Sequence, residues 1–208
     1  MTISRINQSQ LKALRTGALL YLLLIISAPI GLLYVPSTLI VPGDATATAD
    51  HIRASEWLFR IGIGSELFHQ AIAIFLVLAL YRLFKPVNEQ HAKLVVILGA
   101  LVSVPIMFIN VLNEIAALIL VNGADFLSVF SKSQLDALAL LFLRLHEQGT
   151  EIVQIFWGLW LFPYGILVIR SGFIPRLLGY RYVWGQDRSG GRCGPDRHIR
   201  PYARPGRR

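Results

Sequence analysis

Four long apolar segments, separated by short polar stretches, dominate the hydrophobic pattern of the chain. They cover residues 17–35, 57–81, 94–121 and 150–169. A helix needs about 20 apolar residues to cross a hydrocarbon core of about 30 Å, so each segment predicts a membrane-spanning helix. A cleaved signal peptide is the alternative for the first segment, with Ala45-Thr46-Ala47 as its cleavage site. That apolar region is longer, and farther from the cleavage site, than a signal peptide requires.

Turn-forming and capping residues mark where these helices should begin and end. Pro42-Gly43-Asp44 predicts a turn, after which Asp44 or Thr46 would cap a short helix over residues 47–56. Pro86 should end the second span because proline cannot continue a helix. Gly123 should end the third span as a left-handed cap, and Pro105 should bend that span.

The apolar run at residues 135–145 is too short to cross a membrane. Ser133 and Asp136 have the spacing of a capping box at its start. Two interpretations stay open: an interfacial or re-entrant helix, or the front of a long fourth helix that bends near Gly149. The expected fold is four spanning helices plus a short amphipathic helix at the outer leaflet.

Composition supports an all-α, polytopic membrane helix bundle. The chain is 54% hydrophobic and 15% charged, with a mean hydropathy of +0.56, whereas a soluble domain needs more charge on its surface. Residues 1–180 are expected to form the bundle. Residues 181–208 are rich in Arg, Gly and Pro, bury little apolar surface and are expected to be disordered. The 208 residues leave no room for a second sizeable domain.

The basic charge of the chain belongs mainly to that tail. Eight arginines and two aspartates give residues 181–208 a charge of +6, out of +8 for the whole chain. No nucleic-acid partner is therefore expected. Membrane lipid is the expected partner, because an Arg-rich tail suits anionic headgroups, and a homo-oligomer is a further hypothesis. The only cysteine, Cys193, excludes an intrachain disulfide and a multi-cysteine metal site.

Lysine and arginine in the short flanks predict how the bundle is oriented. One side carries Arg5, Lys12 and Arg15, then Arg82, Lys85 and Lys93, then Arg170, Arg176 and the tail. The other side carries Arg53, Arg60, Lys132 and Arg144. Because cytoplasmic flanks are enriched in these residues, both termini are expected in the cytoplasm.

Several separated motifs resemble one bacterial membrane family. They include residues 39–45 (LIVPGDA), 80–88 (LYRLFKPVN), 123–126 (GADF) and 170–179 (RSGFIPRLLG). Over roughly residues 10–180 the chain resembles the family of domain of unknown function 4386. The resemblance implies a polytopic protein of the bacterial inner membrane and no known activity. After Gly179 the chain departs from the expected apolar continuation, and we interpret the basic tail as the product of a frameshift.

Polar residues inside three of the spans form the candidate functional site. They repeat at helical spacing, so each set shares one helix face: Glu66, His69 and Gln70; Asn110, Asn113 and Glu114; and Glu147, Glu151 and Gln154, with His146 one position outside the last set. At about 1.5 Å per residue, the three sets lie at similar depths in the outer half of the bundle. Ionisable groups are costly there and are functional candidates by default.

Three interpretations of these sets stay open. The groups could hydrogen-bond to one another and set the packing, or they could line a pocket that binds or moves a small ligand, with Glu66, His69, Gln70, Asn110, Asn113, Glu114, Glu151 and Gln154 as the candidate residues. They could also hold one divalent metal in a hydrolase acting on lipid-like substrates, through Glu66, His69, His146 and Glu147. The binding protein is the preferred hypothesis, and it needs no cofactor. The sequence has no phosphate loop, nucleophile elbow or HExxH motif.

Overall fold

A computed structural model describes residues 8–172, which are helical apart from short turns and contain no strand. The elements in chain order are α1 (Gln8–Pro29), a π-helical turn (Ile30–Tyr34), α2 (Val35–Leu39), α3 (Ala45–Ala54), α4 (Glu56–Phe84), α5 (Glu89–Val96), a second π-helical turn (Ile97–Val102), α6 (Ser103–Asn122), a 3₁₀ turn (Asp125–Leu127), α7 (Lys132–Leu159) and α8 (Leu161–Ser171). The tail prediction for residues 181–208 lies outside this range.

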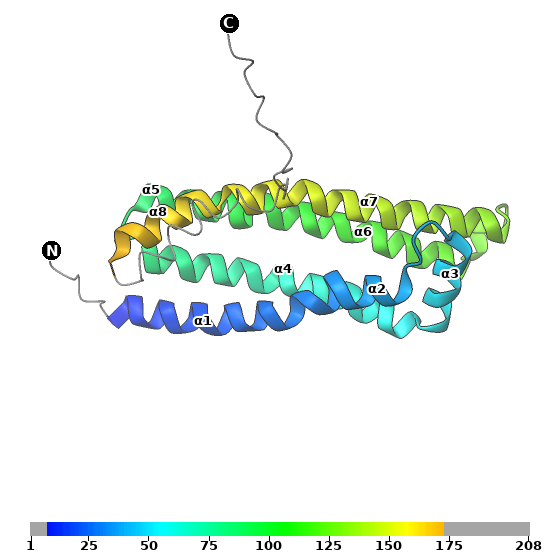
Figure 1. Ribbon diagram of the computed structural model, residues 1–208, viewed down its shortest axis with the longest axis horizontal. Coiled ribbons are helices and arrows are strands. Elements are labelled where there is room, and N and C mark those ends of the chain that lie inside the picture. Colours follow the sequence, from blue (N-terminus) through cyan, green and yellow to red (C-terminus); the bar gives the residue numbers. More distant parts are fainter. Residues whose placement is uncertain (1–7, 173–208) are drawn as a thin grey trace, which may run out of the picture.

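These elements join into four rods that are long and apolar enough to cross a membrane: Gln8–Leu39, Glu56–Phe84, Glu89–Asn122 and Lys132–Ser171. The predicted all-α membrane bundle with four spans is therefore confirmed. The rods run antiparallel, with α1 packed along α4 and α6 packed along α7 (Figure 1). The start of α1 and the end of α8 lie at one end of the bundle, and α3 lies at the other (Figure 1).

The predicted helix ends are found where turn chemistry placed them. Asp44 Oδ1 accepts a hydrogen bond from the backbone N–H of Ala47 at 2.9 Å and so caps α3. Gly123 follows α6 with φ = +67°, in the left-handed region that favours glycine. Helix α4 ends at Phe84, two residues before Pro86.

Both π-helical turns precede a proline. Proline lacks the N–H that would bond the carbonyl four residues earlier, so the backbone near that carbonyl must rearrange. For Pro36 this carbonyl belongs to Leu32, and for Pro105 it belongs to Leu101. Each lies within a π-helical turn, at Ile30–Tyr34 and Ile97–Val102 respectively. The irregularity expected near Pro105 thus takes the form of a widened helical turn.

The apolar run at residues 135–145 is the first half of α7, which decides between the two interpretations left open for it. The helix does not end at Gly149 but continues to Leu159, and α8 restarts at Leu161. Pro163 explains this position, because Leu159 carries the carbonyl that Pro163 cannot bond. The capping box is formed by Ser131 and Gln134, so the prediction that used Ser133 and Asp136 is wrong.

Asp136 instead belongs to a cluster of ion pairs that joins α3 to α7. Its carboxylate is 1% exposed and contacts Arg53, and it accepts from Lys132 Nζ at 3.0 Å. Asp50 binds the same two cations, at 2.7 Å from Arg53 Nη1 and 3.1 Å from Lys132 Nζ. The hydrogen bond from Lys132 lowers the pKa of the Asp50 carboxyl. Arg53 Nε also donates to the Val121 carbonyl at 2.9 Å, which ties α3 to the end of α6.

Most of the buried apolar side chains among residues 8–172 belong to two cores. One core lies toward α3 and includes Ile63 of α4, and the other lies toward α8 and includes Val77 of the same helix. Between these two positions α4 buries Glu66 and Gln70. The arrangement places ionisable groups in the middle of a long apolar helix, so they need partners from neighbouring helices.

Candidate functional site

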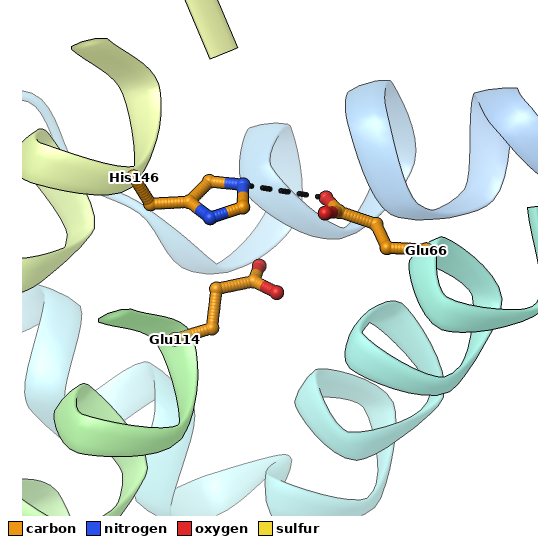
Figure 2. Close-up of side chains that lie close together, drawn as sticks. All are labelled: Glu66, Glu114 and His146. Carbon is orange, nitrogen blue, oxygen red and sulfur yellow. Dashed lines mark ion pairs between the residues drawn. The ribbon is translucent and has the colours of Figure 1, made fainter. Parts of the chain in front are cut away.

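Three ionisable side chains from three different helices meet beside the apolar core that lies toward α3. Glu66 comes from α4, Glu114 from α6 and His146 from α7 (Figure 2). One oxygen of each carboxylate and one imidazole nitrogen all lie within 4.8 Å of one another. Glu66 is 4% exposed and Glu114 is 6% exposed, and the imidazole side chain of His146 is 13% exposed. We call these residues the buried triad.

The three helices bring the buried triad to one level of the bundle. One potential ligand atom of each residue lies within 4.8 Å of the other two, although the residues come from three helices. Of the three polar sets expected from the sequence, these members therefore lie side by side.

Hydrogen bonds orient the imidazole of His146. Its Nδ1 lies 3.2 Å from the backbone carbonyl of Asn110, which only accepts, so Nδ1 carries a hydrogen. Nε2 then faces Glu66, with 3.4 Å between Nε2 and Oε1 (Figure 2). Asn110 Nδ2 donates to the His146 carbonyl at 2.9 Å and to Thr150 Oγ1 at 3.2 Å. Asn113 Nδ2 donates back to the Asn110 carbonyl at 3.1 Å.

The two carboxylates of the buried triad are incompletely satisfied. Glu66 Oε2 and Glu114 Oε2 are buried and have no hydrogen-bond partner within residues 8–172. Leaving a buried acceptor unpaired costs about 1–3 kcal/mol, and more when it carries charge. These two carboxylate oxygens can therefore accept a hydrogen bond from a ligand or bind a cation.

Two glycines leave space for Glu66 of the buried triad and for Asn110, which hydrogen-bonds to His146. A Cβ on Gly31 would lie 2.8 Å from Cγ of Glu66, so the first π-helical turn passes directly over that side chain. A Cβ on Gly149 would lie 2.1 Å from Oδ1 of Asn110, so α7 crosses α6 without a side chain at this point. The position of His146 depends on this close crossing.

A cavity of about 480 Å³ opens onto the buried triad. Its two sides are the segment around α2 and one face of α7, and its floor is formed by Glu66 and Glu114. Four of the lining side chains on α7 are polar or charged and exposed: Arg144, Glu147, Glu151 and Gln154. An exposed charged stripe is costly against hydrocarbon, which indicates that this face meets water or a polar ligand.

The other predicted site residues occupy different places. His69 turns toward α1, where its Nδ1 lies 3.4 Å from Ser27 Oγ, so it does not reach the buried triad. Glu147 is exposed at the cavity wall and pairs with Arg144 at 2.7 Å. Gln70 is buried one turn beyond Glu66. Glu151 and Gln154 line the cavity without joining the triad.

Sequence reasoning missed the supporting residues Gly31, Gly149, Thr150 and Arg144. Two of them carried a signal in the sequence. Gly149 interrupts a run of good helix formers, as a glycine at a close helix crossing does, and Arg144 lies three residues before Glu147, the spacing of an ion pair on a helix. Gly31 and Thr150 carried no comparable signal.

The fold and the site together define a multi-pass membrane protein with a polar cavity inside its helix bundle. The chain belongs to the family described as domain of unknown function (DUF4386), which matches residues 16–186. The resemblance predicted from the motifs is thereby confirmed. No curated protein and no solved structure matches the chain. The function must therefore be argued from the cavity itself.

Proposed function

We propose that this protein binds a small, positively charged ligand in its intramembrane cavity. The observation that carries the proposal is the cavity of about 480 Å³ whose floor holds two buried, incompletely paired carboxylates. Cavities of this size suit small molecules. Ionisable groups at membrane depth are costly against lipid, so they usually pair with one another or line a ligand or ion site. Glu66 Oε2 and Glu114 Oε2 have no such partner within residues 8–172, which favours a ligand.

The charges that line the cavity favour a positively charged ligand over a negatively charged one. Its lining contains four carboxylates, those of Glu66, Glu114, Glu147 and Glu151. Arg144 neutralises Glu147 by an ion pair at 2.7 Å, and His146 faces Glu66. Glu114 and Glu151 have no cation within salt-bridge distance in the described part of the chain. A cation entering the cavity would therefore gain attraction that an anion would not.

A labelling experiment tests both access and charge preference. In a Cys193→Ser background reconstituted in lipid vesicles, Gln154→Cys should react with a water-soluble thiol reagent. Its neighbour Ile155→Cys should not, because Ile155 is 61% exposed on the apolar surface. A cationic methanethiosulfonate should label Gln154→Cys several-fold faster than an anionic one of similar size.

Ser128→Cys is the matched reference, because Ser128 is exposed in the turn before α7 and lies outside the cavity. The rate ratio of the two reagents there corrects for their intrinsic reactivity. Equal labelling of the Gln154 and Ile155 variants would contradict a water-filled cavity. An equal or inverted charge ratio at Gln154 would contradict a cation site.

We also propose that the protein lies in the inner membrane of a bacterium with both termini in the cytoplasm. The excess of lysine and arginine on the side of Lys12, Lys85 and Lys93 supports this orientation. In cells, a membrane-impermeant reagent should label Ser128→Cys before lysis and Gln90→Cys only after it. Gln90 is exposed at the start of α5, at the opposite end of the bundle. The reverse order would invert the proposed topology.

A further inference from the structure

We infer that the buried triad of Glu66, Glu114 and His146 is a binding site for a divalent transition-metal ion of the Zn²⁺ class. The inference rests on the proposed function and names the cation that the cavity takes. It keeps Glu66 and His146 from the metal set expected from the sequence, and it has Glu114 in place of His69 and Glu147. The exchange follows from geometry, because His69 faces Ser27 and Glu147 faces Arg144.

The donor atoms are spaced as a metal requires. Ligands at about 2.0–2.1 Å in a tetrahedral arrangement lie about 3.3 Å from each other. Glu66 Oε1 and His146 Nε2 are 3.4 Å apart, and one potential ligand atom from each of the three residues lies within 4.8 Å of the other two. In the proposed site the Glu114 carboxylate moves closer, so that all three residues bind one ion.

The orientation of His146 is that of a metal ligand. Its Nδ1–H donates to the Asn110 carbonyl, so Nε2 points toward Glu66 Oε1 and, in the neutral ring, presents a lone pair there. Two acceptors at 3.4 Å need something positive between them, which is either a proton or a metal ion. Metal-bound histidines usually donate their second ring nitrogen to a carbonyl or carboxylate in this way, which fixes the ring and its tautomer.

Charge and hydrogen-bonding capacity favour the metal ion. When both are ionised, the carboxylates of Glu66 and Glu114 supply two negative charges, which one divalent cation would cancel beside a neutral imidazole. A metal ion also provides a partner for Glu66 Oε2 and Glu114 Oε2, which are buried and have none among residues 8–172.

The ligand set also indicates the class of metal and leaves a position open. An imidazole nitrogen with carboxylate oxygens suits Zn²⁺ and related transition metals, whereas Mg²⁺ and Ca²⁺ prefer oxygen alone. Three protein ligands leave a fourth position of a tetrahedral ion free, as in zinc sites that meet a substrate. All three residues line the cavity, so this position faces it.

The test is Zn²⁺ binding by the full chain. The protein is purified in detergent without a histidine tag, in the Cys193→Ser background, and the bound metal is measured by elemental analysis and titration. We expect about one equivalent of Zn²⁺ per chain. Glu66→Gln, Glu114→Gln and His146→Ala should each weaken binding by at least about tenfold, because each removes one of three ligands.

Two matched controls separate the triad from its surroundings. His69→Ala removes a partly buried histidine of the same bundle, and Glu56→Gln removes a carboxylate at the start of α4 that lies outside the cavity. Both should retain binding within about threefold, because neither residue is a ligand. Each variant is also checked by circular dichroism, and the Gln variants keep the shape of the side chain, so loss of binding in a folded Glu114→Gln protein reports a lost ligand.

The outcomes distinguish this inference from the proposed function. If the parent binds no Zn²⁺ but Gln154→Cys still reacts preferentially with the cationic reagent, the metal site is refuted and the cation cavity stands. A protonated His146 paired with Glu66 would then explain the geometry. Stoichiometric Zn²⁺ binding that the triad variants leave unchanged would also refute the site, since the ion would lie elsewhere. Metal binding without any labelling at Gln154 would support the site and contradict the open cavity.

Discussion

Replacing Gly149 with alanine is expected to lower the free energy of unfolding by about 2–4 kcal/mol, one of the largest effects of a single methyl group in this bundle. The new Cβ would lie 2.1 Å from Oδ1 and 2.6 Å from Cγ of Asn110. Asn110 is 6% exposed and cannot rotate away without losing its bonds to the His146 carbonyl and Thr150. The measurement is the midpoint of unfolding in detergent, monitored by tryptophan fluorescence.

Gly64→Ala is the control for helix propensity. Gly64 also lies within a helix, but a Cβ there meets nothing within 4 Å, so this variant should be neutral or up to about 1 kcal/mol more stable. Combining Gly149→Ala with Asn110→Ala removes the clash and should cost less than the sum of the two single variants. Strict additivity would show that the two side chains do not meet.

Replacing Asp136 with alanine is expected to cost about 2–3 kcal/mol, since it breaks an ion pair whose carboxylate is 1% exposed. Arg53 would keep its bond to Val121 but lose its buried partner, and Lys132 would keep only Asp50. The estimate is below that for a fully buried pair because Arg53 and Lys132 are partly in solvent. The same unfolding measurement reports the loss.

Asp50→Ala tests whether burial is the cause. Asp50 contacts the same two cations but its side chain is 55% exposed, so its removal should change stability by less than about 1 kcal/mol. The double variant Arg53→Met with Asp136→Leu should recover most of the loss, since apolar side chains often replace a buried pair without penalty. Equal losses for Asp50 and Asp136 would contradict this account.

Most of the fold could be predicted because its causes are local. Twenty apolar residues between polar turns define a span wherever they occur, and Asp44, Pro86 and Gly123 act on the helix ends next to them. The break at Trp160 was missed because Pro163 was not considered, although the same rule correctly ended α4. The exchange of Ser133 for Ser131 as the cap of α7 is a shift of two residues, within the usual uncertainty of helix ends.

The site was harder to predict because it depends on how each helix is rotated against its neighbours. Spacing groups Glu66 with His69, yet the two lie about 60° apart around α4, and this angle sends His69 toward α1. His146 was placed outside the stripe of Glu147, but one step of about 100° turns it from the cavity wall to the interior. The spacing of residues along a helix predicts which side chains share a face, but the packing of that helix against its neighbours determines which face is buried.

The π-helical turn over Ile30–Tyr34 has a consequence for how this cavity could have arisen. Such a turn is equivalent to one residue inserted into an α-helix. Deleting a residue there would restore regular α-helix and rotate the preceding part of α1 by about 100° relative to α2. Ser27, which accepts from Ser65 Oγ at 2.8 Å, would then leave α4. The gain or loss of one codon at this turn therefore changes which face of α1 meets α4.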